Sequence, residues 1–247
     1  KIKDMKKLIT LFFIGLITIS GFAQEQKPLR KIKANGIVQE KNRRVPKYTK
    51  LIVEGEVNIE ILNNDFKNVI RTNGDGNLQQ LYSIVVANEV LTIKRKPGFE
   101  ILNQTVPFKI TLATKDLTDI TLNGDKGTIT NMGAIEILKL NLTNTGGGKM
   151  ELRVKTDELV LNTENSGAIK VEGTANFVKI NSKSTGDIDA KDLSTFYTEV
   201  ESNGSGNIYT NTVNGIDGNL NSTGNLYYRV TKTVNVSENA EGKVIKQ

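Results

Sequence analysis

The chain of 247 residues contains no cysteine, no histidine and no tryptophan. Without cysteine it can form no disulfide framework, no thiolate metal site and no cysteine-linked lipid anchor. Without histidine it lacks the usual general base and the commonest metal ligand, and it cannot build a Ser-His or Cys-His nucleophilic pair. Only carboxylates, lysines, tyrosines and hydroxyls remain for catalysis, so we expect no cofactor, no metal site and no catalytic residue.

Aromatic residues are also sparse, at 6% of the chain, whereas glycine, asparagine and threonine are abundant. Threonine favours strands, and glycine and asparagine favour tight turns. No stretch after the first 23 residues shows a sustained helical period. The composition therefore predicts an all-β protein.

Residues 1–23 have the pattern of a signal peptide. Four lysines among the first seven residues precede the apolar run Leu8–Ile19, and Ser20–Ala23 supplies small residues for cleavage after Ala23. The apolar run of 12 residues is shorter than the roughly 20 that span a bilayer. We therefore expect an exported chain with no transmembrane segment after cleavage, located in the periplasm, at the outer-membrane surface or outside the cell.

The basic charge is concentrated near the predicted new N-terminus. The whole chain carries +6, and residues 1–23 contribute +3 of it. Residues 24–50 carry +7, so the rest of the chain carries about −4. We interpret residues 24–47 as a basic, flexible leader that is solvated, rather than one whose Lys41, Arg43 and Arg44 bind an anionic surface. No aromatic residues are interleaved with these charges, so no nucleic-acid partner is expected.

Residues 48–115 show apolar alternation interrupted by turn residues, which predicts a β-rich region belonging to the same solenoid as the repeats that follow. The predicted strands are Leu51–Val53, Val57–Ile61, Val69–Ile70, Leu81–Ile93 and Val106–Leu112, and the predicted turns are Asn63–Asp65, Asn73–Gly76, Ala87–Glu89 and Pro97–Gly98.

Residues 116–231 repeat with a period of about 20. Such a period is typical of a solenoid in which successive coils pair in parallel and equivalent apolar residues stack inside. Residues 232–247 are expected to form a closing strand and a polar tail. One predicted stack is Ile129, Met150, Ile169, Ile188, Ile208 and Leu226, and a second is Leu122, Leu142, Leu161, Ile180, Val200 and Leu220.

The opening pattern LIVEGEVNIEIL…VIRTNGDGNL…VLTIKRK and the glycine turns NTGGG, ENSG, KSTG, SNGSG and NSTG resemble the auto-transporter adhesin head GIN domain family, common in Bacteroidota. The resemblance covers nearly all of the chain after residue 23. It implies a right-handed parallel β-helix similar to pectin lyases, and an adhesive role without conserved catalytic residues. Only Gly204-Ser205-Gly206 keeps the family's complete Gly-Ser-Gly turn.

Two groups of side chains are candidates for a site. Asp187, Asp189 and Asp192 form an acidic cluster of the kind that polysaccharide-active solenoid enzymes use, but no second carboxylate is stacked beside them, and we interpret them as a solvated acidic spot. Four tyrosines in the last coils are the predicted ligand contacts, with a purely structural tyrosine ladder as the alternative. They are Tyr197, Tyr209, Tyr227 and Tyr228. The repeat register predicts that Tyr209 and Tyr227 stack on the outer face.

The sequence therefore predicts an exported, non-catalytic binding or adhesion protein of the bacterial envelope, whose partner is a surface glycan or a protein. Two alternatives stay open: a polysaccharide-active β-helix lyase or hydrolase, and a structural envelope protein. Neither the identity of the ligand nor the oligomeric state follows from the sequence.

Overall fold

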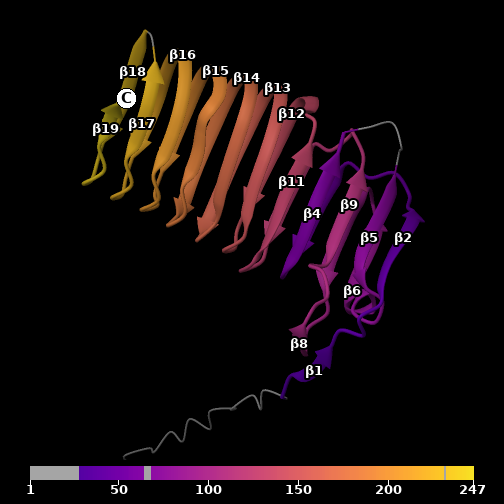
Figure 1. The fold of residues 1–247 in the computed structure, drawn as a ribbon. Coiled ribbons are helices and arrows are strands. Elements are labelled where there is room, and N and C mark those ends of the chain that lie inside the picture. The colour runs from indigo at the N-terminus through magenta and orange to yellow at the C-terminus, as the bar shows by residue number, and fades with distance from the viewer. Residues whose placement is uncertain (1–27, 64–67, 231) are drawn as a thin grey trace, which may run out of the picture.

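The computed structural model describes residues 28–63, 68–230 and 232–247 (Figure 1). The predicted signal peptide at 1–23 and the beginning of the predicted leader lie outside these ranges. Within them, no helix is both long and apolar enough to cross a membrane. The helical content of the described chain is the 3-10 turn η1 (Gln79–Leu81).

The described residues form nineteen strands. Seventeen of them build one continuous sheet that winds along the molecule, and β1 and β8 form a separate two-stranded sheet (Figure 1). In chain order the strands are β1 (Arg30–Lys33), β2 (Val38–Arg44), β3 (Lys50–Glu54), β4 (Val57–Leu62), β5 (Val69–Asp75), β6 (Tyr82–Ala87), β7 (Val90–Arg95), β8 (Phe99–Asn103), β9 (Lys109–Ala113), β10 (Asp119–Asn123), β11 (Gly127–Met132), β12 (Ile135–Asn144), β13 (Lys149–Asn165), β14 (Ala168–Ser184), β15 (Ile188–Ser202), β16 (Ile208–Leu220), β17 (Leu226–Val230), β18 (Thr233–Glu238) and β19 (Val244–Lys246).

The first predicted stack is confirmed in full. Each of its six members is the register partner of the next, and all are at most 1% exposed. The stack also continues beyond the prediction, to Ile59 on β4 and to Val244 on β19. The all-β solenoid inferred from the period is therefore the observed fold.

The second predicted stack is correct in the middle and wrong at both ends. Leu142, Leu161, Ile180 and Val200 are successive partners, but the residue opposite Leu142 on β10 is Ile120. Ile120 and Leu122 are both buried and lie two residues apart in the chain. The period alone therefore cannot decide which of them belongs to the stack. Leu122 lies opposite Asn144 instead.

At the other end, Gly218 and not Leu220 lies opposite Val200. Gly218 has φ +146°, and a Cβ added there would lie 1.8 Å from the carbonyl oxygen of Val200. Only glycine fits at such an approach, so the stack is interrupted at this coil. Leu220 is instead paired with Ser202.

The N-terminal region belongs to the same sheet as the repeats, but it is not wholly parallel. β3 pairs in parallel with β7 and β10, and β4 pairs in parallel with β9 and β11. In contrast, β5 runs antiparallel to β9, and β6 and β7 form an antiparallel hairpin. The predicted turn of this hairpin is confirmed by positive φ values at Asn88 and Glu89.

Two local predictions in this part of the chain are wrong. The expected turn at Asn73–Gly76 is mostly strand, because β5 extends to Asp75 and Gly74 lets the ring of Phe108 approach the backbone closely. The expected flexible leader is ordered where it is described: β1 pairs with β8, and all seven residues of β2 pair antiparallel with β5. The free edge of β5 explains why the leader is ordered. A charged strand can form backbone hydrogen bonds with this edge while its side chains stay in water.

The C-terminal residues form two strands, β18 and β19, rather than one closing strand followed by a polar tail. β18 pairs in parallel with β16, and β19 pairs in parallel with β17. The repeat therefore continues past the predicted end at residue 231.

Candidate binding face

One column of outer residues lies beside the first buried stack. Strand side chains alternate between the two sides of a sheet, so the residue after each buried member points outward. Register pairs place these outer residues in one row, which we call the Tyr face: Glu151, Lys170, Asp189, Tyr209, Tyr227 and Ile245.

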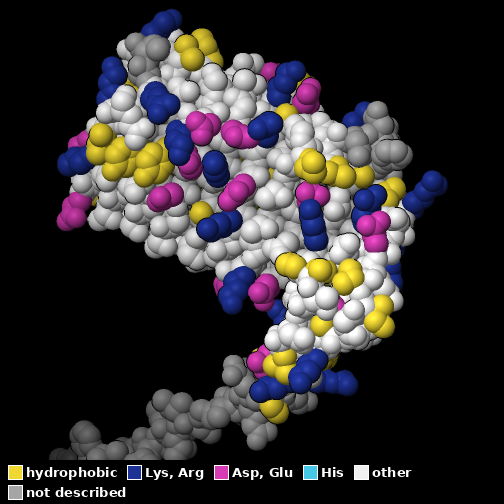
Figure 2. All heavy atoms as spheres, viewed as in Figure 1, with side chains coloured by type: hydrophobic (Ala, Val, Ile, Leu, Met, Phe, Trp, Pro, Cys, Tyr) yellow, Lys and Arg dark blue, Asp and Glu magenta, His cyan; other side chains and the backbone are white. Residues whose placement is uncertain are grey.

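Tyr209 and Tyr227 form the centre of the apolar part of this face. Their rings are stacked, with centroids 4.9 Å apart and planes inclined by 10°. Ile245, 37% exposed, follows Tyr227 in the row. Figure 2 shows a row of hydrophobic side chains over this end of the solenoid. Each stacked ring covers one face of the other, and Asp189 and Ile245 flank the pair in the row, so the pair offers a ligand its ring edges and hydroxyl groups.

Polar side chains beside the tyrosines brace neighbouring coils. The carboxylate of Asp187 accepts a hydrogen bond from the backbone N–H of Asn207 at 2.8 Å. The side-chain oxygen of Asn207 accepts one in turn from the N–H of Asn225 at 3.1 Å. Burial raises the pKa of Tyr209, and the negative charge of Asp187 raises it further. The Tyr209 phenol therefore stays a neutral hydrogen-bond donor at and above neutral pH.

Two of the three aspartates of the predicted acidic cluster, Asp187 and Asp189, already have polar partners. Asp187 accepts the hydrogen bond from the backbone N–H of Asn207, and Asp189 forms an ion pair with Lys191 at 2.9 Å. Among the residues that the structure describes, no group of three or more His, Cys, Asp or Glu side chains is placed to hold a metal ion.

Only two of the four predicted tyrosines lie together. Tyr228 pairs in register with Thr210, and its half-buried ring packs against the core. Tyr197 lies in the second half of β15, where it pairs with Phe177 and Gly215. Its ring stacks on that of Phe177, with centroids 6.0 Å apart. Tyr197 and Tyr228 therefore belong to other positions in the coil.

The Tyr face also has a polar concavity that the sequence analysis missed. A cavity of about 380 Å³ lies near its β11–β14 end. Arg153 and Glu172 form an ion pair there at 2.6 Å, and the side chain of Asn131 bonds both the N–H and the carbonyl of Arg153. The sequence signal was Gly133, whose positive φ of +79° lies in the connection between the end of β11 at Met132 and the start of β12 at Ile135. The lining residues include Thr130, Asn131, Glu151, Arg153, Lys170 and Glu172.

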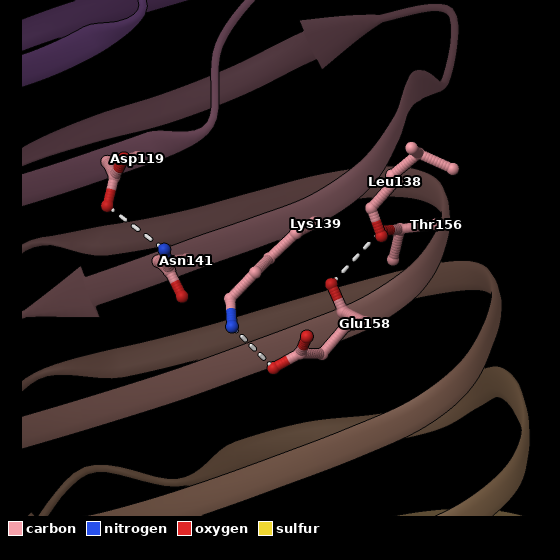
Figure 3. Close-up of polar contacts among 6 residues, drawn as sticks. All are labelled: Asp119, Leu138, Lys139, Asn141, Thr156 and Glu158. Carbon is pink, nitrogen blue, oxygen red and sulfur yellow. Dashed lines mark hydrogen bonds and ion pairs between the residues drawn. The ribbon is translucent and has the colours of Figure 1, made fainter.

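Charged residues elsewhere on the coils are paired between neighbouring strands. Figure 3 shows Lys139 of β12 reaching Glu158 of β13, with 2.6 Å between nitrogen and oxygen, and Asn141 donating to Asp119 of β10 at 3.0 Å. In the same view Leu138, 75% exposed, points away from the strands. Over the coils in Figure 2, acidic and basic side chains lie close together in the same way.

Comparison with known proteins agrees with this geometry. The family profile described as "Putative auto-transporter adhesin, head GIN domain" matches residues 47–231. A search of curated proteins finds no match.

Several solved structures share the fold. A "putative adhesin" from Bacteroides fragilis has a TM-score of 0.82 at 22% identity, covering 87% of this chain and 100% of its own. A "putative adhesin" from Parabacteroides merdae has a TM-score of 0.65 at 20% identity, covering 88% and 99%. A "putative lipid binding protein" from Parabacteroides distasonis has a TM-score of 0.66 at 18% identity, covering 88% and 100%. At these identities the likeness establishes the fold alone.

Proposed function

Because this chain belongs to the family of auto-transporter adhesin head GIN domains, we propose that it is an exported, non-catalytic binding protein that attaches to a surface glycan or protein through its Tyr face. The signal-peptide pattern of residues 1–23 supports export. The family's description and the names of the structural neighbours support binding as the role.

The observation that carries this proposal is the row of outer side chains along one continuous sheet. From Glu151 to Ile245 the row crosses five strand spacings, which correspond to about 24 Å at roughly 4.8 Å each. The row begins at a polar concavity and ends at the stacked tyrosines and Ile245. A flat row of this length suits an extended ligand, such as several sugar units or a peptide segment.

The stacked geometry defines how the tyrosines would contact such a ligand. Tyr209 and Tyr227 cover each other, and the neighbours in the row are Asp189 on one side and Ile245 on the other. A sugar ring would therefore not lie flat on either aromatic ring. The ligand would instead accept or donate hydrogen bonds at the two phenol hydroxyls and pack on the ring edges.

The state of the acidic residues supports a role without catalysis. Catalytic carboxylates in glycan-active enzymes act as a pair, with one of them holding a raised pKa. On these coils Asp189, Glu172 and Glu158 are each ion-paired with a lysine or arginine. The pairs of Glu172 and Glu158 join neighbouring coils, and the pair of Asp189 lies within β15, so all three carboxylates already have cationic partners.

Glycan-array binding of two double variants tests the proposal. In Tyr209→Phe/Tyr227→Phe the ring stack is kept and the hydroxyls are lost, so we expect binding to weaken at least tenfold while urea unfolding is unchanged. The matched control is Tyr197→Phe, which removes a hydroxyl in a different column. Unchanged binding in Tyr209→Ala/Tyr227→Ala with reduced stability would instead identify a structural ladder.

A depolymerisation assay on the same glycans, with calcium added, separates the proposal from the enzyme alternative. We expect binding without new reducing ends and without new unsaturated ends. Cleavage that is lost in Asp189→Asn would refute the non-catalytic assignment, and an array without any bound glycan or protein would favour a structural envelope role.

A further inference from the structure

A second concavity lies at the opposite end of the molecule from the tyrosine pair. Its volume is about 640 Å³, and its lining residues come from β8 and from the N-terminal coils. Figure 1 shows the β1–β8 sheet next to these coils. Its walls come from the β3–β4 turn, β6, β7 with the Pro97–Gly98 turn, β8, and the β10–β11 loop. No residue of the Tyr face lines it.

Specific contacts hold this junction cleft open. Arg95, whose side chain is 19% exposed, bonds Glu56 at 2.7 Å through one nitrogen and the carbonyl of Phe99 at 3.0 Å through another. On the far side of β8, the buried carboxylate of Asp75 accepts hydrogen bonds from the hydroxyl and the N–H of Thr105, at 2.6 and 2.8 Å. The cleft is therefore formed before any ligand enters.

The lining of the junction cleft is unusually aromatic for this chain. The whole sequence has 8 phenylalanines and 6 tyrosines, and three of these fourteen residues line this one cavity. Tyr82 and Phe108 stack with centroids 3.9 Å apart, and Phe99, which is half-buried, also lines the cavity. Asn58, Gln104 and the carboxylate of Glu56 add hydrogen-bonding groups.

The charges in the junction cleft do not cancel. Arg95 is paired with Glu56, and Glu100 with Lys31 at 3.9 Å. Lys96 and Lys126 also line the cavity, and among the described residues neither has an ion pair with an acidic group. Two ammonium groups without an acidic partner attract a ligand that carries a carboxylate. The aromatic side chains beside them favour a ligand that also has an apolar face, and the polar groups favour one with hydroxyls.

We propose that the junction cleft binds a carboxylated sugar, such as a hexuronate unit of an acidic polysaccharide. Lys96 and Lys126 hold its carboxylate, the ring C–H face packs against Phe99 or Tyr82, and Glu56 and Gln104 accept its hydroxyl hydrogens. The cavity volume lies within the roughly 300–1,000 Å³ typical of small-ligand sites. This site is separate from the Tyr face and does not depend on it.

Isothermal titration calorimetry at low salt tests this inference, with trigalacturonate as the probe and the uncharged galactose trisaccharide as its comparison. We expect trigalacturonate to bind and the neutral sugar to bind at least tenfold more weakly. Lys96→Gln/Lys126→Gln should weaken trigalacturonate binding at least tenfold, and Lys96→Arg/Lys126→Arg should keep it. Phe99→Ala should weaken binding of both sugars.

The matched control is Lys246→Gln, which removes one exposed positive charge at the other end of the solenoid. An equal loss in this control would show that only net charge matters and would overturn the site. Equal or tighter binding of inorganic phosphate, or of a glutamate-rich peptide, would overturn the sugar assignment, as would no binding by any probe to the folded protein. Tyr209→Phe/Tyr227→Phe should leave trigalacturonate binding unchanged, so the two proposals fail separately.

Discussion

The N-terminal part of the solenoid and the coils from β12 onward share one sheet, but their strands pair differently. In the coils the strands pair in parallel with the equivalent strands of the neighbouring coils, and the outer side chains form straight rows. In the N-terminal part the antiparallel strands β2, β5 and β6 interrupt this order. The comparison shows that regular coils produce straight outer rows, whereas the junction cleft lies in the part of the molecule where the pairing is irregular.

The interiors of the two regions also differ. The N-terminal part is filled by large side chains such as Tyr48, Phe108 and Leu81. The last coils instead bury hydroxyls: Thr195, Thr198 and Thr212 are at most 2% exposed and bond one another at 2.7–3.1 Å. A buried hydroxyl is tolerated when it has a partner, so a narrow coil can be closed without bulky side chains.

The largest expected effect tests how tightly the regular coils are packed. Gly218→Ala places a Cβ 1.8 Å from the carbonyl oxygen of Val200, so the two coils must separate. We expect a loss of about 3 kcal/mol or more in the free energy of unfolding, measured by urea denaturation. Gly36→Ala is the control: its φ of +74° is also positive, but a Cβ there would meet no atom within 4 Å. Equal losses in both variants would mean that backbone strain, not coil contact, is responsible.

The polar interior of the last coils is expected to show an intermediate effect. Thr198→Val keeps the side-chain shape but removes the hydroxyl that lies 2.7 Å from that of Thr212 and 3.0 Å from that of Thr195. We expect destabilisation by about 1 to 2 kcal/mol in thermal or urea unfolding, because buried hydroxyls lose a partner. A stabilised variant would show that the network serves a purpose other than stability.

The smallest expected effect is a local response to acid in the N-terminal part. The hydroxyl of Thr105 holds the pKa of Asp75 below its ordinary value of 3.8. The carboxylate therefore contributes stability that is complete above the unfolded pKa and is lost as the pH falls through the lower folded pKa. We expect the Thr105 amide to lose hydrogen-exchange protection below about pH 3.8, while the coil amides keep theirs.

Asp75→Asn is the control for this acid response. It removes the titrating group, so the hydrogen-exchange protection of the Thr105 amide should be weaker but independent of pH between about 5 and 3. This range extends roughly one pH unit to either side of the usual aspartate pKa. Equal acid sensitivity in the variant and the parent protein would assign the effect to other carboxylates.

The parts of the fold that the sequence predicted are those that repeat. Ile129, Met150 and Ile169 recur at nearly equal spacing, and the alternation around them identifies strands and their inner faces. The prediction was wrong where two buried residues lie two positions apart, as at Ile120 and Leu122, because both satisfy the same period. It was also wrong at β2. The charged residues there suggested a solvated leader, but the segment pairs as a strand with the edge of β5.

The candidate sites were predicted in the same uneven way. The pairing of Tyr209 with Tyr227 follows from the period and is confirmed by the register. Tyr197 and Tyr228 were grouped with this pair because they lie in the same coils, although strand alternation already places Tyr228 on the other side of the sheet from Tyr227. The junction cleft had no sequence signal, since its lining residues come from segments as distant as Glu56 and Lys126.

The sequence by itself determined that this protein is an all-β solenoid with coils of about 20 residues, because one coil can bury its apolar side chains only against an equivalent neighbour. The tertiary structure alone decided the register at the ends of the repeat, the order of the basic strand β2, and the cleft beside β8. These features depend on whether a Cβ fits against a distant carbonyl and on which strand edge is open. Both are properties of neighbours that are far apart in the chain.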